Sequence, residues 1–430
     1  MIPNPMEKFM SGRNAFYAQS GGVSAVINAS ACGVLQTARQ YSDHIAKVFA
    51  GRNGIIGALT EDLIDTSSES EAAIAALKHT PGAAFGSCRY KLRSISEHRA
   101  QYERLMEVFE AHDIGFFFYN GGGDSQDTAY KVSLISTELS NPIVCVGIPK
   151  TVDNDLAITD NAPGFGSAAK YLATSLREAA FDLLAMSGTS TKVFVLEVMG
   201  RHAGWTTAAC ALAGEQEGDA PHVLLLPEVP FHEQRFLVRV DEALKRYGHC
   251  VIAMAEGVKE SDGAFLSAGS KDAFGHAQLG GVGSLIADLI STKLHSKCHW
   301  AVPDYLQRSA RHIASEIDVE HAYAVGRAAV EFAIAGRNAV MPAIRRLSDA
   351  PYRWDIIEAP LSAVANKEKL LPPDFISADG FGITEAARRY LAPLIVGEAY
   401  PPYRSGLPDY AKLEKVAVGK KLTRAFDLQV

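Results

Sequence analysis

The chain contains no apolar run long enough to cross a membrane and no excess of basic charge. Its 430 residues carry 42 Lys and Arg against 49 Asp and Glu, which gives a formal net charge of −7. Nucleic acids and anionic membranes are bound through clustered positive charge, so this balance argues against both kinds of partner. No apolar stretch approaches the roughly 18 residues that span a bilayer. The opening residues, MIPNPMEKFMSGRN, lack the apolar core of an export signal, so we expect a cytoplasmic protein.

Cysteine is also sparse, because only six cysteines are spread along the chain and none has CxxC spacing. Several lie inside apolar stretches, which favours reduced core thiols over a disulfide framework or a zinc site. Apolar residues make up 47% of the chain and charged residues 21%. These values are ordinary for a globular protein, and the length exceeds one typical core, so two lobes are expected.

Short apolar runs alternate with helical patterns along most of the chain. Strands are predicted at Asn14–Ala18, Ile45–Ala50, Ile114–Tyr119, Ile143–Val146, Lys192–Val198, Val223–Leu226 and His249–Ala255. This alternation with short connections predicts an α/β fold with two doubly wound, Rossmann-like lobes. The active site is then expected between the lobes, at the carboxyl ends of the strands.

Several local features are predicted as well. Ser24 is expected to cap a helix, and Gly121–Thr128 is predicted to be a loop. Pro342 is expected to end a short strand, Asn338–Met341, and a polar loop or hairpin is predicted at Val258–Lys271.

Charged residues follow five of the predicted strands. A single such residue is most often part of a surface ion pair of little energetic worth. Five at the same topological position indicate a site, because the carboxyl edge of a sheet is a small region. They are Asp124, Lys150 with Asp153, Arg201, Glu228 and Arg308.

Two stretches near the middle of the chain suggest phosphate chemistry. Gly121–Thr128, GGGDSQDT, offers backbone N–H groups to a phosphate chain without side chains in the way. Gly147–Asp155, GIPKTVDND, adds a cation, a hydroxyl and two carboxylates: Lys150, Thr151, Asp153 and Asp155. Phosphoryl transfer needs such a set, since the protein mainly positions groups and neutralises charge. These residues predict a kinase-type phosphotransferase. A dinucleotide-binding oxidoreductase is disfavoured, because Ser20–Ser24 lacks G-x-G-x-x-G spacing.

In order and spacing, the motifs of this chain resemble those of the phosphofructokinase family. They are SGG at 20–22, FGSCR at 85–89, GGGDS at 121–125, PKTVDND at 149–155, MGR at 199–201, PE at 227–228 and YLQR at 305–308. The resemblance covers most of the chain. It implies Mg²⁺-dependent phosphoryl transfer to the 1-hydroxyl of fructose 6-phosphate, in a homodimer or homotetramer.

The resemblance also implies a role for each matching residue. Asp153 matches the general base, Thr151 a residue that holds the transferring phosphoryl group, and Asp155 one that orients the site. Lys192 matches a cation contributed across a subunit interface, and Lys297 is a looser candidate for a further phosphate ligand. Besides Thr151 and Asp153, the implied contacts to fructose 6-phosphate are Met199, Gly200, Arg201, Glu228, Tyr305 and Arg308. The implied donor contacts are Gly22, Arg89, Gly123, Asp124 and Ser125.

Two residues favour pyrophosphate over ATP as the donor. Lys150 replaces a glycine of the ATP-dependent enzymes, and its ammonium can neutralise a pyrophosphate leaving group. Asp124 also replaces a glycine, and its carboxylate would occupy the space of an α-phosphate and repel it. The pyrophosphate branch commonly reads GGDD, whereas this chain has Gly123 at the first Asp position. Mg²⁺ is therefore expected on Asp124, with Asp153 and the phosphates as the alternative.

We expect residues 1–160 with about 310–360 to form the donor lobe, and residues 161–309 with about 361–430 to form the sugar-phosphate lobe. Three other functions stay open at this point. The first is an ATP-dependent phosphofructokinase, and the second is a catalytically silent, sugar-phosphate-binding regulatory subunit, against which intact Asp153, Thr151 and Arg201 argue. The third is a related kinase acting on a dinucleotide, which the MGR and YLQR motifs disfavour.

Overall fold

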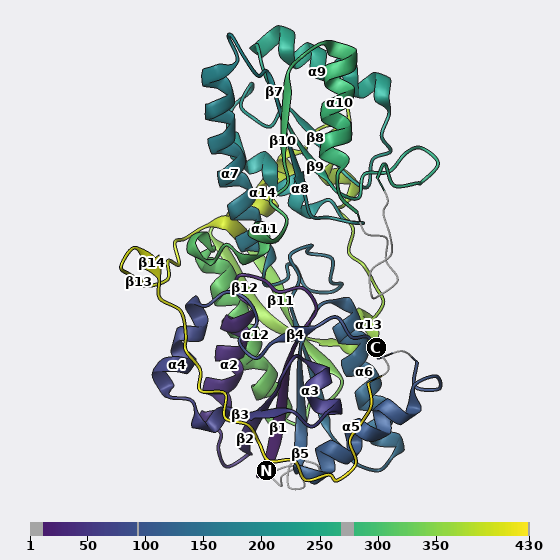
Figure 1. Ribbon diagram of the computed structural model, residues 1–430, viewed down its shortest axis with the longest axis vertical. Helices are drawn as coiled ribbons and strands as arrows, with labels where there is room; N and C mark the ends of the chain where they lie inside the picture. Colours follow the sequence, from purple (N-terminus) through teal and green to yellow (C-terminus); the bar gives the residue numbers. More distant parts are fainter. Residues whose placement is uncertain (1–11, 93, 268–278, 429–430) are drawn as a thin grey trace.

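Two α/β lobes are stacked along the long axis of the molecule (Figure 1). The computed structural model describes residues 12–92, 94–267 and 279–428. The lower lobe contains an eight-stranded sheet in the order β12-β11-β6-β5-β1-β2-β3, with β4 paired to β1. The upper lobe contains a four-stranded sheet in the order β10-β7-β9-β8, in which all neighbours are parallel. The predicted two-lobed, doubly wound fold is confirmed.

The lower sheet is built mainly from the first third of the chain. Its strands are β1 (Arg13–Ser20), β2 (Ile45–Gly51), β3 (Leu63–Asp65), β4 (Ser87–Cys88), β5 (Ile114–Gly121), β6 (Val144–Pro149), β11 (Val340–Asp349) and β12 (Tyr352–Pro360). Side chains alternate between its two faces. On one face lie α3 (Ile55–Leu59), α5 (Arg99–Ala111), α6 (Gly123–Glu138) and α13 (Leu361–Val364). On the other lie α2 (Ile27–Gln40), α4 (Glu71–Ala76) and α12 (Glu316–Ile334).

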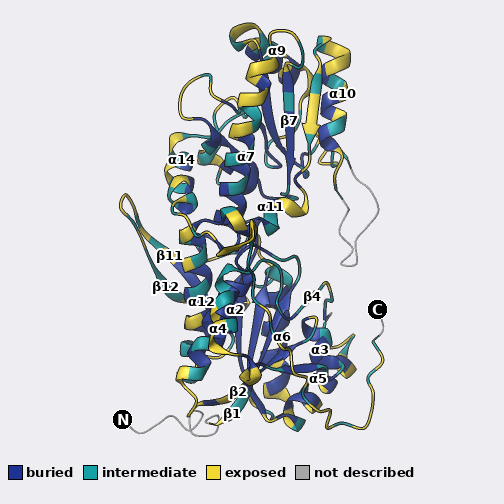
Figure 2. Ribbon diagram, turned by 60° about the vertical axis from the view of Figure 1, so that its left-hand side comes forward, coloured by how far each residue is buried: buried dark blue, intermediate teal, exposed yellow. Residues whose placement is uncertain are grey.

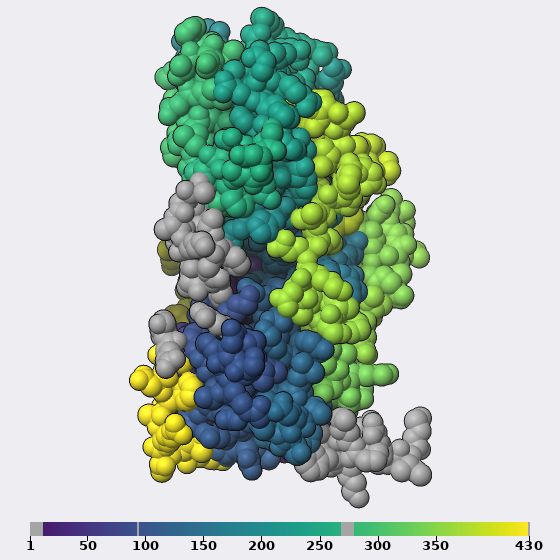
Figure 3. Space-filling model, turned by 90° about the vertical axis from the view of Figure 1, so that its right-hand side faces the viewer, coloured from purple at the N-terminus to yellow at the C-terminus, as the bar shows by residue number. Residues whose placement is uncertain are grey.

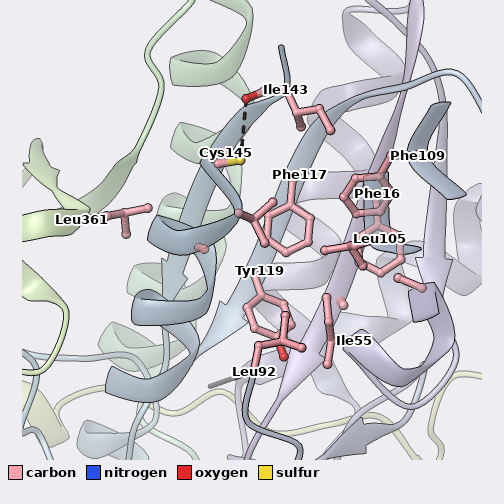
Figure 4. Close-up of a cluster of buried hydrophobic side chains, with 14 of the residues drawn as sticks. Phe16, Ile55, Leu92, Leu105, Phe109, Phe117, Tyr119, Ile143, Cys145 and Leu361 are labelled. Carbon is pink, nitrogen blue, oxygen red and sulfur yellow. Dashed lines mark hydrogen bonds between the residues drawn. The ribbon is translucent and has the colours of Figure 1, made fainter. Parts of the chain in front are cut away.

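Aromatic side chains fill the face of the lower sheet that packs on α5 (Figure 4). Phe16 of β1 stacks on Phe117 of β5 with ring centroids 5.7 Å apart, and Phe109 of α5 lies 5.4 Å from Phe16. All three rings are buried. Burying rings of this size contributes a large apolar area, so this cluster holds rigid the two strands that lead into the donor loops.

The upper lobe repeats the layered arrangement on a smaller scale. Its strands are β7 (Val193–Val198), β8 (Val223–Leu225), β9 (Cys250–Ala255) and β10 (Cys298–Ala301). Its helices are α7 (Phe165–Met186), α8 (Trp205–Ala209), α9 (Glu233–Tyr247), α10 (Val282–Leu294) and α11 (Tyr305–Ser309). Figure 2 shows the inner strands of both sheets buried and the outer faces of the helices exposed. Within the described part of the chain, no helix is both long and apolar enough to span a bilayer.

The C-terminal part of the chain connects both lobes. Helix α14 (Glu385–Leu391) packs against α8 of the upper lobe, and the β13 (Tyr403–Arg404) and β14 (Leu407–Pro408) hairpin follows. The tail then runs along the lower lobe (Figure 1), where Val418 N donates to Leu63 O over 2.8 Å. The predicted boundary placed all of 361–430 in the upper lobe, whereas α13 and this tail pack against the lower sheet.

Three local predictions are wrong for physical reasons. Helix α2 begins at Ile27 without a side-chain cap, and Ser24 Oγ instead accepts from Val26 N at 3.4 Å. Most of Gly121–Thr128 is helical, because α6 starts at Gly123. A first helical turn tolerates glycine where its N–H groups have no intrahelical partner anyway.

The third wrong prediction concerns Pro342, which does not end its strand. Strand β11 (Val340–Asp349) is ten residues long and continues past Pro342. Its pairing with β6 is confined to Val340, and two residues beyond Pro342 the Ile344 N–H points away from β12, to Thr159 Oγ1. The nitrogen of Pro342 faces the same side, where no ladder partner requires an N–H. The loop predicted at Val258–Lys271 forms a hairpin through the Lys259–Phe265 bridge, and its residues after 267 lie outside the described residues.

Candidate active site

A cleft of about 790 Å³ lies between the carboxyl ends of the lower strands and the upper lobe. The lower lobe contributes residues 20–23, which follow β1, residues 89–91, which follow β4, and residues 122–125, which follow β5. The upper lobe contributes residues that follow β7, β9 and β10. The site therefore lies at the predicted edge of both sheets.

Most of the predicted site residues line this single cleft. They are Gly22, Arg89, Gly123, Asp124, Ser125, Lys150, Thr151, Asp153, Asp155, Met199, Arg201, Tyr305 and Arg308. The structure brings together groups that are almost 290 positions apart in sequence, as the numbers of Gly22 and Arg308 show. Lys192, Gly200 and Glu228 do not line it.

The loop after β6 presents the carboxylates of Asp153 and Asp155 to the cleft. Asn154, between them, points its own side chain into the protein. Asn154 has a φ of 54°, in the left-handed region that asparagine tolerates better than most residues. Its buried side chain accepts from Ala162 N at 3.0 Å, which closes the loop. Asp153 and Asp155 on either side line the cleft, and Asp153 N donates to Thr151 Oγ1 at 3.1 Å.

Burial makes these carboxylates weaker acids than usual. Loss of hydration raises the pKa of Asp153, and the charges of Asp155 and Glu256 raise it further. Loss of hydration also raises the pKa of Asp155. A carboxylate whose pKa is raised is a better proton acceptor near neutral pH, so the geometry and the charge of Asp153 suit a general base.

Lys150 lies at the centre of the donor side of the cleft. Its Nζ donates to Gly22 O at 2.5 Å, and its backbone N donates to Gly121 O at 3.1 Å. Burial, helped by the charges of Arg308 and Arg89, lowers its pKa to about 8, although the charge of Asp153 opposes the change. The lysine thus connects the loops that follow β1, β5 and β6.

Arg308 lies against the donor loop. Its guanidinium contacts the Tyr305 ring, 4.1 Å from the ring centroid. A Cβ added to Gly22 would come within 2.6 Å of Arg308 Nη1. A side chain at position 22 would push the end of Arg308 aside, so glycine allows the guanidinium to approach the donor loop this closely. Arg308 was predicted as a sugar-phosphate contact, and in the structure it lies next to Gly22, between the two predicted subsites.

Comparison with known proteins identifies the family of this chain. The family model described as phosphofructokinase matches residues 14–333. The chain belongs to the phosphofructokinase family.

The most similar relatives cover nearly the whole chain. It is 64% identical to the pyrophosphate--fructose 6-phosphate 1-phosphotransferase of Methylococcus capsulatus, over 97% of this chain and 100% of that protein. It is 62% identical to the protein of the same name from Halomonas elongata, over 96% and 99% of the two chains. A crystal structure of a pyrophosphate-dependent phosphofructokinase from Nitrosospira multiformis matches with a TM-score of 0.90 at 59% identity, covering 97% of this chain and 100% of that one.

One predicted sugar-binding residue of this phosphofructokinase does not lie with the others. Glu228 lies outside the cleft, where its Oε1 accepts from Gly204 N at 2.9 Å and Leu371 N at 3.0 Å. The reason is strand order: β8 is an edge strand and β9 separates it from β7. Glu256, which directly follows β9, lines the cleft with Arg201. Glu256 is also an acid at a strand end, but the sequence analysis did not select it.

Sequence analysis also missed Lys91. Its Nζ lies 2.5 Å from Asp124 Oδ1, and both side chains are about one-third exposed on the cleft wall. The pair joins the short loop after β4 to the first turn of α6. The two residues are far apart in sequence and belong to no common motif, so only the fold reveals the contact.

Lys192 and Lys297 lie side by side at the other end of the upper sheet. Lys192 N donates to Lys297 O at 3.1 Å, at the amino ends of β7 and β10. Both residues are exposed. Arg201 follows the opposite end of β7, so neither lysine can reach the cleft of its own chain.

The described carboxylates that line this phosphofructokinase site do not form a ready-made metal cluster. The described residues contain no cluster of three or more His, Cys, Asp or Glu side chains placed to hold a metal ion. Mg²⁺ keeps several waters and is usually held by one or two carboxylates together with substrate phosphates. The donor set therefore fits an Mg²⁺ ion that arrives with its phosphate ligands and binds Asp124.

Proposed function

We propose that the chain is a pyrophosphate-dependent 6-phosphofructokinase. It transfers a phosphoryl group from pyrophosphate to the 1-hydroxyl of fructose 6-phosphate and releases phosphate and fructose 1,6-bisphosphate. The reaction runs in both directions. The observation that carries this proposal is that Lys150 and Asp124 line the same cleft as Asp153 and Arg201, and the names of the full-length relatives support it.

The donor side of the cleft suits an inorganic polyphosphate. Lys150, Arg89 and Arg308 lie close enough for each arginine to lower the lysine's pKa. Three cations beside one cleft stabilise the charge that builds up on a departing phosphate. The Asp124 carboxylate places a negative charge where a longer polyphosphate would continue.

The acceptor side positions the sugar hydroxyl for in-line attack. Asp153 takes the proton of the sugar hydroxyl, Asp155 keeps the loop oriented, and Thr151 holds the phosphoryl group during its transfer. Positioning reactants in this way lowers the barrier without covalent chemistry by the protein. Arg201 and Met199 bind the sugar phosphate together with Tyr305 and Arg308, while Gly200 connects the first two, and Glu256 replaces Glu228 as the ligand of a sugar hydroxyl.

We also propose Mg²⁺ as the cofactor and Asp124 as its protein ligand. The ion would neutralise phosphate charge when bound. Asp124 is already paired with Lys91, so the carboxylate is held in place by a cation before any donor arrives. With Asp124 on the ion, Lys91 would be free to contact the phosphates.

The two lobes divide the substrates between them. Residues 1–160 with about 310–360, α13 and the C-terminal tail form the donor lobe, and residues 161–309 with the part of 361–430 between α13 and the tail form the sugar-phosphate lobe. Lys192 and Lys297 act in a neighbouring subunit's sugar site, in a homodimer or homotetramer. A cytoplasmic location stays a prediction.

Phosphorus NMR of the purified protein tests the reaction directly. With pyrophosphate, fructose 6-phosphate and Mg²⁺, the pyrophosphate signal should fall as inorganic phosphate and fructose 1,6-bisphosphate appear in equal amounts. Adding the products should regenerate pyrophosphate. Pyrophosphate loss without a sugar bisphosphate would identify a hydrolase, and no change at all would favour the silent regulatory subunit.

A further inference from the structure

A short segment from the C-terminal part of the chain, residues 366–371, lies between the two loops that form the site; we name it the crossing segment. On one side, Lys369 N donates to Asp155 O at 2.7 Å. On the other side, Trp205 Nε1 donates to Lys369 O at 2.9 Å. Trp205 begins α8, directly after the loop that carries Arg201. Figure 3 shows the yellow-green part of the chain alongside both lobes.

The side chain of Lys369 holds the loop of the general base at both of its ends. Its Nζ donates to Asn154 Oδ1 at 3.3 Å, to Thr159 O at 3.0 Å and to Asp160 O at 2.6 Å. An ammonium group has three donors, so all of them are used. Asn154 is the inward-turned residue whose left-handed conformation directs its two neighbours into the cleft.

This lysine is held at an electrostatic cost. Removal of its ammonium group from water lowers its pKa to about 8, and the nearby charges of Asp160 and Asp155 offset part of that change. The ammonium also lies 5.1 Å from the centre of the Trp205 ring, a distance at which a cation is attracted to the ring face. Lys369 does not line the cleft, so any effect on the reaction must act through the residues it holds.

We propose that Lys369 is a positioning residue, which keeps the loop of Asp153 in register with the loop of Arg201. The inference rests on the proposed function, because it assigns these loops to the base and to the sugar phosphate. Through Lys369, the crossing segment is hydrogen-bonded to the loop of Asp153 and to Trp205, which directly follows the loop of Arg201. Since a shift of about 1 Å in reacting groups costs about 10²-fold in rate, loss of this link acts on the chemical step.

The test compares Lys369→Met with Lys170→Met. Lys170 is the matched control: it is buried, donates to Gly397 O at 2.6 Å and pairs with Glu398 at 2.8 Å, and it does not line the cleft. We expect Lys369→Met to lower kcat roughly 10- to 100-fold, with KM for pyrophosphate within about threefold of wild type. Lys170→Met should keep kcat near wild type even where both variants melt earlier.

Hydrogen exchange over residues 150–164, measured by mass spectrometry, gives a second readout that needs no activity. Exchange in this segment should accelerate at least about tenfold in Lys369→Met and stay at the wild-type rate in Lys170→Met. Unchanged exchange, or an equal fall in kcat in both variants, would overturn the inference. An inactive wild type would refute the proposed function alone, because the exchange result would still decide whether Lys369 holds the loop.

Discussion

At the scale of single residues, burial brings the pKa values of Asp153 and Lys150 closer together. It raises the pKa of Asp153 and lowers that of Lys150 to about 8. Two groups whose ordinary pKa values differ by about six units thus titrate closer to neutrality. The proposed mechanism requires Asp153 without its proton and Lys150 with its proton, so activity should be confined to the pH interval between their two pKa values.

The pH dependence of kcat/KM for pyrophosphate tests this arrangement. As pH rises through about 8 in the free enzyme, Lys150 loses its proton and kcat/KM should decline. On the acid side, kcat/KM should fall at a pH above the ordinary aspartate pKa, because Asp153 is protonated there. Lys150→Arg retains its charge, so its alkaline decline should shift to higher pH. An alkaline limb that is identical in both enzymes would contradict the assignment.

Asp153→Ser tests the general base. Removing a positioned base costs about 10²–10⁴ in kcat, whereas binding of pyrophosphate should change little. Steady-state kinetics in both directions measure the loss. Asp241→Ser removes an exposed carboxylate that pairs with Lys245, and it should leave kcat near wild type. An Asp153→Ser variant with more than a tenth of wild-type kcat would rule out this role.

At the scale of secondary-structure elements, α2 and α12 pack with their backbones almost in contact. A Cβ added to Gly326 would lie 2.1 Å from Ser30 O, and one added to Gly33 would lie 2.3 Å from Tyr323 O. Reciprocal glycines let the two helices pack closely behind the first strand. This contact supports the start of α2, which follows the donor loop after β1.

Gly326→Ala should therefore destabilise the fold. Overpacking of a close contact costs about 1–3 kcal/mol, so Tm should fall by several degrees in a thermal melt. Gly188→Ala is the matched control, because nothing lies within 4 Å of a Cβ added there, and its Tm should equal that of wild type. If both variants melt at the wild-type temperature, the helix contact is looser than described.

How far the sequence predicts these elements depends on what each one requires locally. Buried parallel strands leave a recognisable pattern, so β5, β7 and β9 were predicted within a few residues. The order of the strands in a sheet leaves no such pattern in the sequence, and this is why Glu228 rather than Glu256 was predicted as a sugar ligand. Contacts between distant segments are equally invisible, as with Lys91 and Asp124, or Lys369 and Asn154. The spacing of the sequence motifs, by contrast, identified most of the residues that line the cleft.

At the scale of the whole molecule, the predicted phosphate ligands of one chain do not all lie at the same cleft. Lys192 and Lys297 are exposed at the amino ends of β7 and β10, whereas the cleft lies at the carboxyl ends of the strands. If they serve a sugar site, that site belongs to another subunit.

Subunit complementation tests the shared site. Asp153→Ser and Lys192→Ala should each be impaired at low fructose 6-phosphate. In a dimer refolded from an equal mixture, roughly a quarter of the wild-type activity should return, since half of randomly paired dimers are hybrids with one intact site. Activity equal to the mean of the two separate variants would show that Lys192 acts within its own chain or not at all.

The central claim is that Lys150 and Asp124 shape the donor side of the cleft for pyrophosphate. The most direct measurement is the ratio of kcat/KM for pyrophosphate to kcat/KM for ATP, at saturating fructose 6-phosphate and matched free Mg²⁺. The account predicts a ratio well above one hundred, equivalent to about 3 kcal/mol of discrimination. A ratio near or below one would contradict it.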